Sequence, residues 1–201
     1  MAPVTQILLI ANVGVFFLQT FAEPVMMTYF ALWPLHMPGG LYPPEVGFQP
    51  WQLVTYSFLH GGLTHLLFNM LALYMFGSDL ERVFGQRRFT IYYFVCVVSA
   101  ALAQLAISAL TNLPPYPTVG ASGGVFGLLL AFGLYFPRRM VMLLFPPIPM
   151  PAWLFVTLYG ALELFLGVTG TQQGVAHFAH LGGMLGGYLT IRVWRSRSRL
   201  L

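Results

Sequence analysis

Six polar side chains of types that carry out acid–base and acyl-transfer chemistry lie in or beside strongly apolar stretches of the chain. They are His65, Asn69, Ser122, Glu163, His177 and His180. A serine hydroxyl becomes a nucleophile when a base such as histidine takes its proton, and N–H donors can stabilise the oxyanion that forms next. Ionisable groups at membrane depth are costly, so each of them is a candidate for function.

Ser122 and His180 occupy matching places on two apolar segments. Ser122 begins "SGGVFGLLLAFGLYF", where Gly133 would lie about 20° from it on a helix, and His180 has Gly183 and Gly187 within about 60°. Small residues let membrane helices approach closely, so two such helices could bring the hydroxyl and the imidazole together. The alternatives are a serine bonded to its own backbone, a histidine bonded within the bundle, and glycines that serve packing alone.

A third segment supplies candidate donors for an oxyanion. His65 and Asn69 are four residues apart, so they share one face of a helix. The backbone N–H of Ser122 at a helix N-terminus would add a donor in a favourable electrostatic position. We therefore predict that His65, Asn69 and Gly120 lie on the oxyanion and substrate side of the site.

Two further ionisable residues, Glu163 and His177, lie outside this set of nucleophile, base and oxyanion donors. No Asp or Glu stands close to these motifs in sequence, so we expect a Ser–His dyad rather than a triad. Glu163 could bond to a neighbouring helix, gate the substrate or take a direct part. His177 lies one turn outward from His180, at the expected cavity mouth, and this histidine pair has no third ligand in sight, so we expect no metal and no cofactor.

The composition indicates a membrane protein. Of 201 residues, 58% are hydrophobic and 7% are charged, whereas a soluble domain has roughly 25% charged residues. The lone Cys96 excludes an intramolecular disulfide and a cysteine-based metal site. A helix that spans a membrane needs about 20 mostly apolar residues. The chain contains several such stretches, so we predict one all-α membrane domain over residues 1–201. The six expected spans are residues 5–21, 63–80, 89–110, 119–136, 152–168 and 175–194.

The positive charges are segregated along the chain. All nine are arginines, and they lie after the second, fourth and sixth spans. The positive-inside rule then predicts that both termini are cytoplasmic, with residues 195–201 as a basic tail. The net charge of +4 thus reflects membrane topology and contact with lipid headgroups, and we expect no nucleic-acid partner. Asp79 and Glu81, beside Arg82, are interpreted as a solvated interfacial cluster.

The loop after the first span, residues 22–50, is unusually rich in aromatic, Pro and Gly residues. An exposed linker would be more polar, so we expect this loop to associate with the outer leaflet. It is followed by "PWQLVTYSFLH", whose apolar spacing predicts a short interfacial helix.

Three motifs together resemble the rhomboid intramembrane serine proteases: "HLLFNM", "GASGGVFGLL" and "AHLGGMLGG". The resemblance covers residues 51–187 and implies a six-helix bundle with a water-filled site that opens to the outside. It implies that Ser122 is the nucleophile, that His180 is the base, and that Asn69 and His65 lie on the oxyanion side. It also implies that Gly183 and Gly187 pack the sixth span on the fourth.

Two positions depart from the family pattern. The family often has Trp-Arg in the first loop, but this chain has Trp51-Gln52, so the loop cannot be anchored through that arginine. Some members have a tyrosine four residues after the serine, beneath the histidine, where this chain has Phe126. Phe126 can stack on the ring but cannot donate a hydrogen bond, and with Glu163 it is a candidate for gating.

We therefore predict a serine endopeptidase of the bacterial inner membrane that cleaves single-span membrane proteins near the outer membrane edge. A helical substrate must first unwind, which favours Gly, Ala or Pro near the cut. The first alternative is a non-catalytic rhomboid-like protein that binds membrane helices. The second is a transporter or channel, for which we would expect inverted repeats that the sequence does not contain. The sequence does not indicate an oligomeric state.

Overall fold

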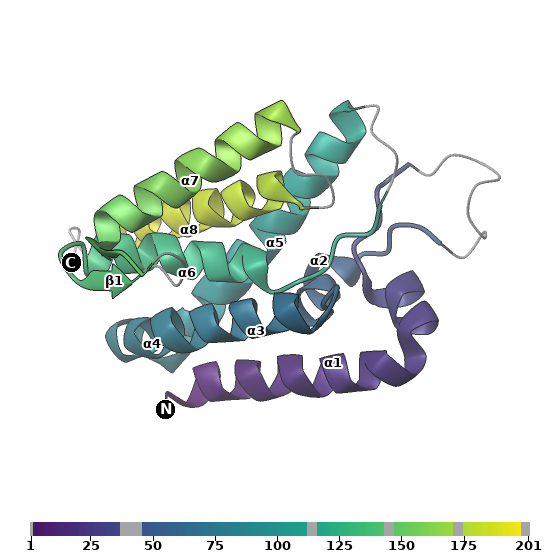
Figure 1. The fold of residues 1–201 in the computed structure, drawn as a ribbon, viewed down its shortest axis with the longest axis horizontal. Helices are drawn as coiled ribbons and strands as arrows, with labels where there is room; N and C mark the ends of the chain where they lie inside the picture. Colours follow the sequence, from purple (N-terminus) through teal and green to yellow (C-terminus); the bar gives the residue numbers. More distant parts are fainter. Residues whose placement is uncertain (1, 37–45, 112–115, 143–146, 171–174, 198–201) are drawn as a thin grey trace.

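A computed structural model describes residues 2–36, 46–111, 116–142, 147–170 and 175–197 (Figure 1). These residues form a helical bundle with one β-hairpin, which confirms the predicted all-α class. The helical segments are α1 (Pro3–Phe30), α2 (Gln52–Thr55), η1 (Tyr56–Phe58), α3 (Leu63–Ala72), the π-helical η2 (Leu73–Gly77), α4 (Ser78–Phe84), α5 (Gln86–Leu110), α6 (Ser122–Tyr135), α7 (Ala152–Thr169) and α8 (His177–Arg197).

Three helices among the described residues are long and apolar enough to cross a membrane, namely α1, α5 and α7. Helix α6 is apolar but has 14 residues, or about 21 Å, against a hydrocarbon core of roughly 30 Å. The predicted spans 63–80 and 175–194 correspond in position to α3–η2–α4 and α8. That these two segments cross the membrane stays a prediction.

Helix α1 is longer than predicted and is bent. The sequence predicted a span that ends at residue 21, but the helix continues to Phe30 through a kink at Ala22 (φ −136°, ψ 34°). Pro24 explains the kink, because proline lacks an N–H and its ring clashes with the preceding turn. Figure 1 shows the last part of α1 turned away from the rest of the helix. Residues 22–30 are therefore helical, and residues 37–45 of the predicted loop lie outside the described part of the chain.

The loop after α1 is anchored by a buried glutamine. The Gln52 side chain accepts hydrogen bonds from the N–H groups of Trp33 (3.2 Å) and Gln49 (3.1 Å). It donates to the carbonyls of Gly47 (3.1 Å) and Tyr29 (3.3 Å). Gln52 thus ties both sides of the loop together although the family's arginine is missing. The predicted short helix that contains it is present as α2 and η1.

Helix α8 packs between α5 and α6 through glycines. A Cβ atom on Gly183 would lie 2.8 Å from the carbonyl carbon of Gly123 on α6. The other two predicted packing glycines face different neighbours, so their expected place in one α6–α8 contact is wrong. Gly187 faces Tyr92 and Cys96 of α5, and Gly133 faces Val156 of α7. The close approach predicted from small residues is real, but it is spread over three helix pairs.

A buried carboxylate joins α4 to the start of α1. Glu81 accepts hydrogen bonds from the backbone N–H groups of Val4 (2.9 Å) and Thr5 (2.8 Å) and from the Thr5 hydroxyl (2.8 Å). It therefore caps free amides at the positive end of α1. Glu81 is only 3% exposed, so the interpretation of it as a solvated residue is wrong. Asp79 fits that interpretation better, because it pairs with the exposed Arg82 and Arg139.

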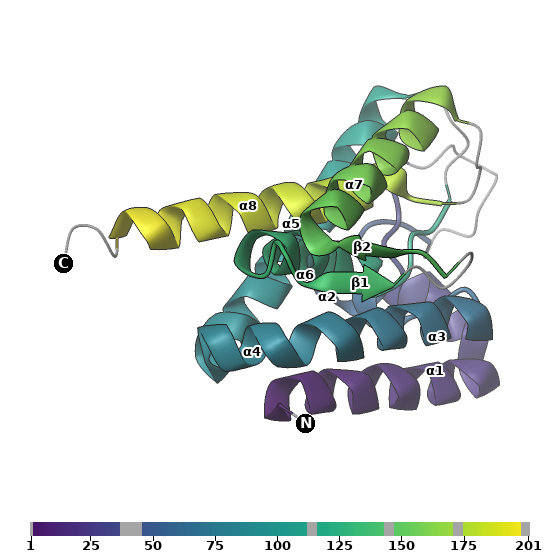
Figure 2. The same cartoon turned by 60° about the vertical axis from the view of Figure 1, so that its left-hand side comes forward.

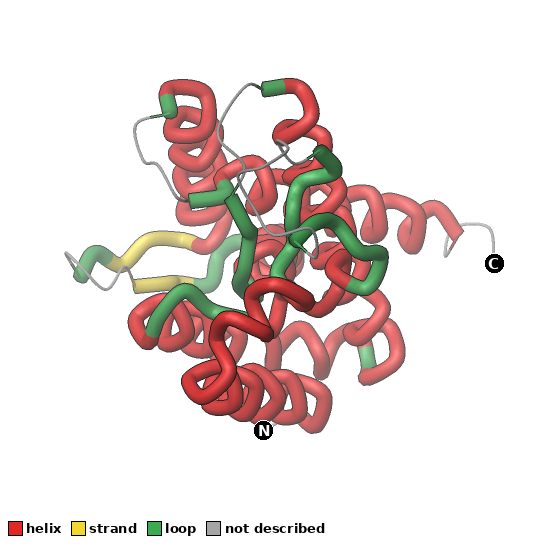
Figure 3. Tube along the Cα trace, turned by 90° about the vertical axis from the view of Figure 1, so that its right-hand side faces the viewer, coloured by secondary structure: helices red, strands yellow, loops and turns green. Residues whose placement is uncertain are grey.

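A short hairpin that the sequence did not predict connects α6 to α7. Its strands are β1 (Met140–Met142) and β2 (Pro149–Pro151), which pair antiparallel with Val141 opposite Met150. Figure 2 shows the hairpin beside α6 and above α3. Figure 3 looks onto the end of the bundle that lies on the right in Figure 1, where loop segments lie in front of the helices. Helices α3, α6 and α8 begin at that end, whereas α1 begins and α8 ends at the other (Figure 1).

Candidate active site

The structure brings Ser122 and His180 into hydrogen-bond contact. The distance from Ser122 Oγ to His180 Nε2 is 2.9 Å. Ser122 is the first residue of α6, and His180 lies in the first turn of α8. The Gly123–Gly183 contact holds these two helix ends together, so residues 58 positions apart in sequence meet at one point.

Other side chains contact one face of the His180 imidazole and both of its nitrogens. Phe126 lies one turn after Ser122, and its ring stacks on His180 with centroids 4.2 Å apart and planes 6° apart. His180 Nδ1 lies 2.8 Å from Glu163 Oε2 of α7, and Nε2 faces Ser122. The ring therefore cannot rotate without the loss of a contact. The motifs themselves contain no carboxylate, but the contact with Glu163 agrees with the alternative that this residue bonds to a neighbouring helix.

Glu163 also contacts the second histidine of α8. His177 Nδ1 lies 2.7 Å from Glu163 Oε2, and the His177 side chain is only 5% exposed. His177 is thus buried and bonded, not placed at the cavity mouth as its helical position suggested. The sequence could not reveal this cluster, because helical spacing does not say which face of α7 packs against α8.

The same cluster has the composition of a metal site. Glu163, His177 and His180 offer three ligand atoms within 4.8 Å of one another. Two histidines and a glutamate can hold zinc. The third ligand that the sequence lacked is therefore Glu163, although in this arrangement its oxygen already lies within hydrogen-bond distance of both imidazoles.

His65 presents a nitrogen to the space beside the serine. The N–H of Gly61 points to His65 Nδ1 at 3.3 Å, so neutral His65 carries its proton on Nε2. A Cβ atom on Gly120 would lie 2.7 Å from His65 Nε2 and 3.7 Å from Ser122 Oγ. Only glycine fits there, because its φ of +123° is also strained for other residues. His65 Nε2–H thus lies on the same side of the cavity as the hydroxyl, with Gly120 between them.

The other predicted oxyanion residues are placed less directly. Asn69 lines the same cavity, and its side-chain amide donates one hydrogen bond to the carbonyl of His65 at 2.9 Å. The amide has a second hydrogen that this bond does not use. The N–H of Gly120 donates to the carbonyl of Tyr56 at 3.0 Å, so Gly120 supplies space rather than a donor. Ala121, the residue before α6, provides no side-chain cap, which leaves the first amides of the helix available to an anion.

His60 is a neighbour that the sequence reasoning missed. It is 1% exposed, and its ring lies edge-on to His65 with centroids 5.1 Å apart. Burial, and secondly the nearby His65, lower the pKa of His60 to about 4, so it is uncharged at neutral pH. Gln19 of α1 holds its backbone through two hydrogen bonds of 2.8 and 3.0 Å. The buried His60 ring therefore supports the His65 ring by packing edge-on against it.

The polar residues open into an apolar cavity of about 640 Å³. His65, Asn69, Ser122 and His180 line it together with Gly61. The rest of its wall is mainly apolar and comes from α3, η2, α6, α7 and β1. This cavity can admit an extended apolar peptide segment to the serine.

Comparison with known proteins identifies relatives over most of the chain. Residues 47–197 match the family model of the rhomboid domain. Rhomboid protease GluP of Bacillus subtilis is 31% identical over 140 residues, which cover 69% of this chain and 25% of GluP. RHOMBOID-like protein 4 of Arabidopsis thaliana is 34% identical over 161 residues, which cover 75% of this chain and 36% of that protein. Rhomboid protease AarA of Providencia stuartii is 29% identical over 202 residues, which cover 92% of this chain and 70% of AarA. The chain thus spans well under half the length of GluP and RHOMBOID-like protein 4.

Proposed function

The chain belongs to the rhomboid family of intramembrane proteases and is an integral membrane protein, and on that premise we propose that it is a serine endopeptidase with Ser122 as nucleophile and His180 as base. The observation that carries this proposal is the 2.9 Å contact between Ser122 Oγ and His180 Nε2 beside an apolar cavity. A hydroxyl paired with an imidazole in such a site is suited to acyl transfer.

The reaction follows from these contacts. His180 Nε2 takes the hydroxyl proton as Ser122 Oγ attacks the peptide carbonyl carbon. The protonated ring then gives that proton to the departing amine, which leaves an ester on Ser122. A water molecule, deprotonated by the same nitrogen, attacks the ester, and the acid product leaves as the proton returns to Ser122. The protein ends unchanged, with one peptide bond hydrolysed.

The negative charge on the carbonyl oxygen needs donors during both attacks. His65 Nε2–H and the second Asn69 amide hydrogen are the side-chain donors on that side of the cavity. The uncapped N-terminus of α6 adds backbone amides. The loss of one such donor typically lowers kcat on the order of 10²–10³-fold.

The apolar cavity supports a membrane-protein substrate. A peptide bond inside a transmembrane helix is protected because its backbone is fully hydrogen-bonded. Residues of low helix propensity ease the unwinding that would expose it. We therefore propose single-span membrane proteins with Gly, Ala or Pro near the scissile bond as substrates.

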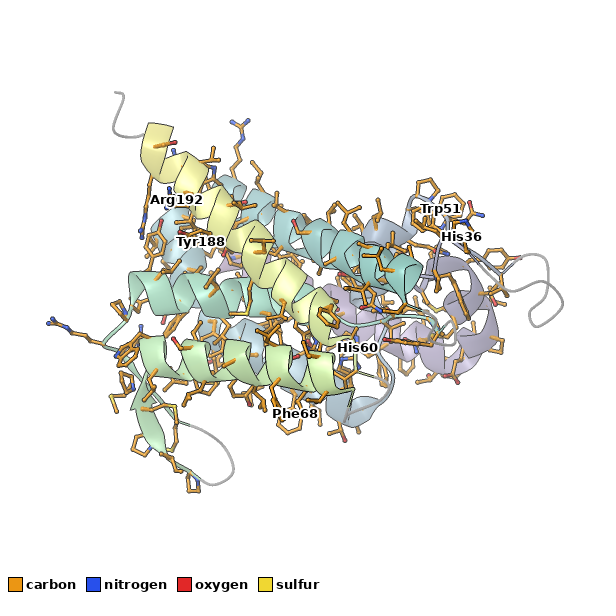
Figure 4. The ribbon with its side chains drawn as sticks, turned by 90° about the horizontal axis from the view of Figure 1, so that it is seen from above. His36, Trp51, His60, Phe68, Tyr188 and Arg192 are labelled. Atoms are coloured by element: carbon orange, nitrogen blue, oxygen red, sulfur yellow. The ribbon has the colours of Figure 1, made fainter. Side chains whose placement is uncertain are left out.

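The arrangement of charge supports an orientation of the protein. Figure 4 shows Arg192 and Tyr188 of α8 at one end of the bundle, with Trp51 and His36 at the other. Ser122 and His180 lie at the starts of their helices, away from the arginine-bearing end of α8. By the positive-inside rule, the termini face the cytoplasm of a bacterial inner membrane and the site opens to the outside.

Cleavage by the purified protein in lipid bilayers tests this proposal. We expect a reporter with a single apolar span to be cut by the wild type and not by Ser122→Ala or His180→Ala. Ser57→Ala is a matched control, because the Ser57 hydroxyl bonds the carbonyl of Val54 at 2.7 Å within its own turn. Cleavage by Ser122→Ala at the wild-type rate would contradict Ser122 as the nucleophile. A wild type that binds the reporter span without cleaving it would favour a non-catalytic role in binding membrane helices.

A further inference from the structure

Glu163 is a buried carboxylate that the two-residue mechanism does not use. One oxygen, Oε2, lies 2.7 Å from His177 Nδ1 and 2.8 Å from His180 Nδ1. The side chain is 9% exposed, and a buried charge of this kind is tolerated when polar partners satisfy it. Glu163 comes from α7, so its contacts with α8 are made only in the folded protein.

These contacts select one tautomer of the base. An ionised carboxylate only accepts hydrogen bonds, so both imidazoles donate to it through Nδ1–H. A protonated Oε2 could donate to one imidazole at most. Neutral His180 with its proton on Nδ1 has its lone pair on Nε2, 2.9 Å from Ser122 Oγ. This is the tautomer that can take the proton of the hydroxyl.

The carboxylate also faces the charge that catalysis creates. When Nε2 of His180 takes the proton, the ring becomes a cation with Oε2 only 2.8 Å from its other nitrogen. A fixed negative charge at that distance stabilises the cation as it forms. The proton on Nδ1 stays there, and Glu163 stays ionised throughout.

We propose that Glu163 completes a Ser122–His180–Glu163 triad as a positioning residue. It orients His180 and stabilises its charged form without contact with the substrate. His177 holds the carboxylate from the other side by its own Nδ1–H. This inference rests on the proposed function, because it assigns a role in the same reaction.

Glu163→Gln is the primary test, because it preserves the size of the side chain and removes its charge. We expect kcat to fall on the order of 10²–10⁴-fold, as when the acid of a Ser–His–acid triad is replaced by its amide. KM should change little, because Glu163 does not line the cavity. A fall in kcat of less than tenfold would overturn the triad.

The pH profile separates positioning from a purely structural role. The titratable groups that face His180 are Glu163 from α7, His177 from its own helix and His65 from α3. Removal of the negative charge of Glu163 makes the cationic form of His180 less stable. The acid limb of the kcat/KM profile should therefore move to lower pH in Glu163→Gln. An unmoved limb would contradict the proposal, because a helix brace would not change it.

Thr157→Ala on the same helix is the matched control. The exposed Thr157 hydroxyl donates to the carbonyl of Trp153 at 2.8 Å within its own turn of α7. We expect kcat within about threefold of the wild type. If Thr157→Ala lost as much activity as Glu163→Gln, the loss would come from disturbance of α7 and the triad would be wrong.

Two further measurements make the possible failures distinguishable. A wild type that is inactive under all conditions would count against the proposed function itself, whereas an active wild type with an active Glu163→Gln would overturn the triad alone. If Glu163→Gln does not fold, ¹⁵N chemical shifts of the His180 ring in the wild type decide the question. A proton on Nδ1 and none on Nε2 is the expected result, and the reverse would overturn the proposal.

Discussion

The contact between Gly183 of α8 and Gly123 of α6 sets the separation of base and nucleophile. A Cβ atom on Gly183 would lie 2.8 Å from the carbonyl carbon of Gly123 and 3.2 Å from the Gly123 Cα. The carbonyl oxygen of Gly123 would lie closer still. All three atoms belong to the backbone and cannot rotate away. Non-bonded carbon atoms prefer about 3.5–4.0 Å, so Gly183→Ala should separate the helix ends on the order of 1 Å.

That displacement is enough to break the catalytic contact. The Ser122–His180 distance of 2.9 Å would grow beyond hydrogen-bond range. A misplacement of about 1 Å can cost on the order of 10²-fold in rate, which is the fall in kcat/KM that we expect for Gly183→Ala. Overpacking should also lower the unfolding free energy by about 1–3 kcal/mol, against a gain of about 1 kcal/mol in helix propensity.

The assay is reporter cleavage in bilayers together with a thermal unfolding midpoint. Gly160→Ala on α7 is the matched control, because a Cβ atom there would meet the flexible Met184 side chain at 3.4 Å. We expect the control to preserve the rate and to raise the midpoint slightly, through the gain of about 1 kcal/mol in helix propensity. A Gly183→Ala protein with the wild-type rate and midpoint would refute the reasoning from helix separation.

Three other substitutions test the supports of the site. Gln52→Leu removes four hydrogen bonds to backbone groups of the loop, one of them buried and three partly buried, and should lower the unfolding free energy by about 2–4 kcal/mol; an unchanged value would mean that the loop does not depend on this anchor. Glu81→Gln should lower it by about 1–3 kcal/mol, whereas Asp79→Asn, which breaks exposed ion pairs, should cost less than about 1 kcal/mol; equal losses would contradict the capping role of Glu81. Phe126→Ala should lower kcat up to about tenfold, because stacking is worth roughly 0.5–1.5 kcal/mol, and Phe126→Tyr should preserve the rate. Equal rates for these two variants would show that the ring does not hold His180.

Helical spacing was enough to place Ser122 and His180 on facing helices. Each stands at the start of an apolar helix whose small residues require a close neighbour, and the structure brings the two side chains together. The same reasoning could not say which neighbour each glycine meets. Gly187 and Gly133 are small enough for close packing, but they contact α5 and α7 respectively. The local spacing of residues does not determine which helices are neighbours in the fold.

Contacts between distant elements explain the other differences. Glu163 reaches α8 only because α7 packs beside it, and Glu81 reaches the start of α1 across 76 residues. Pro24 was a visible signal, but it bends α1 rather than ending it. Gln52 shows a different limit, because the family pattern has an arginine there, whereas a glutamine amide offers both donors and an acceptor to the loop backbone.

Covalent labelling of the wild type with a fluorophosphonate tests the central claim most directly. Such a probe reacts with a serine that a base has activated, and peptide mass mapping then locates the adduct. We predict a single adduct, on Ser122. A competing reporter span should slow the labelling reaction, and His180→Ala should abolish it. A protein that cleaves the reporter while Ser122 stays unlabelled, or that is labelled equally without His180, would contradict the account.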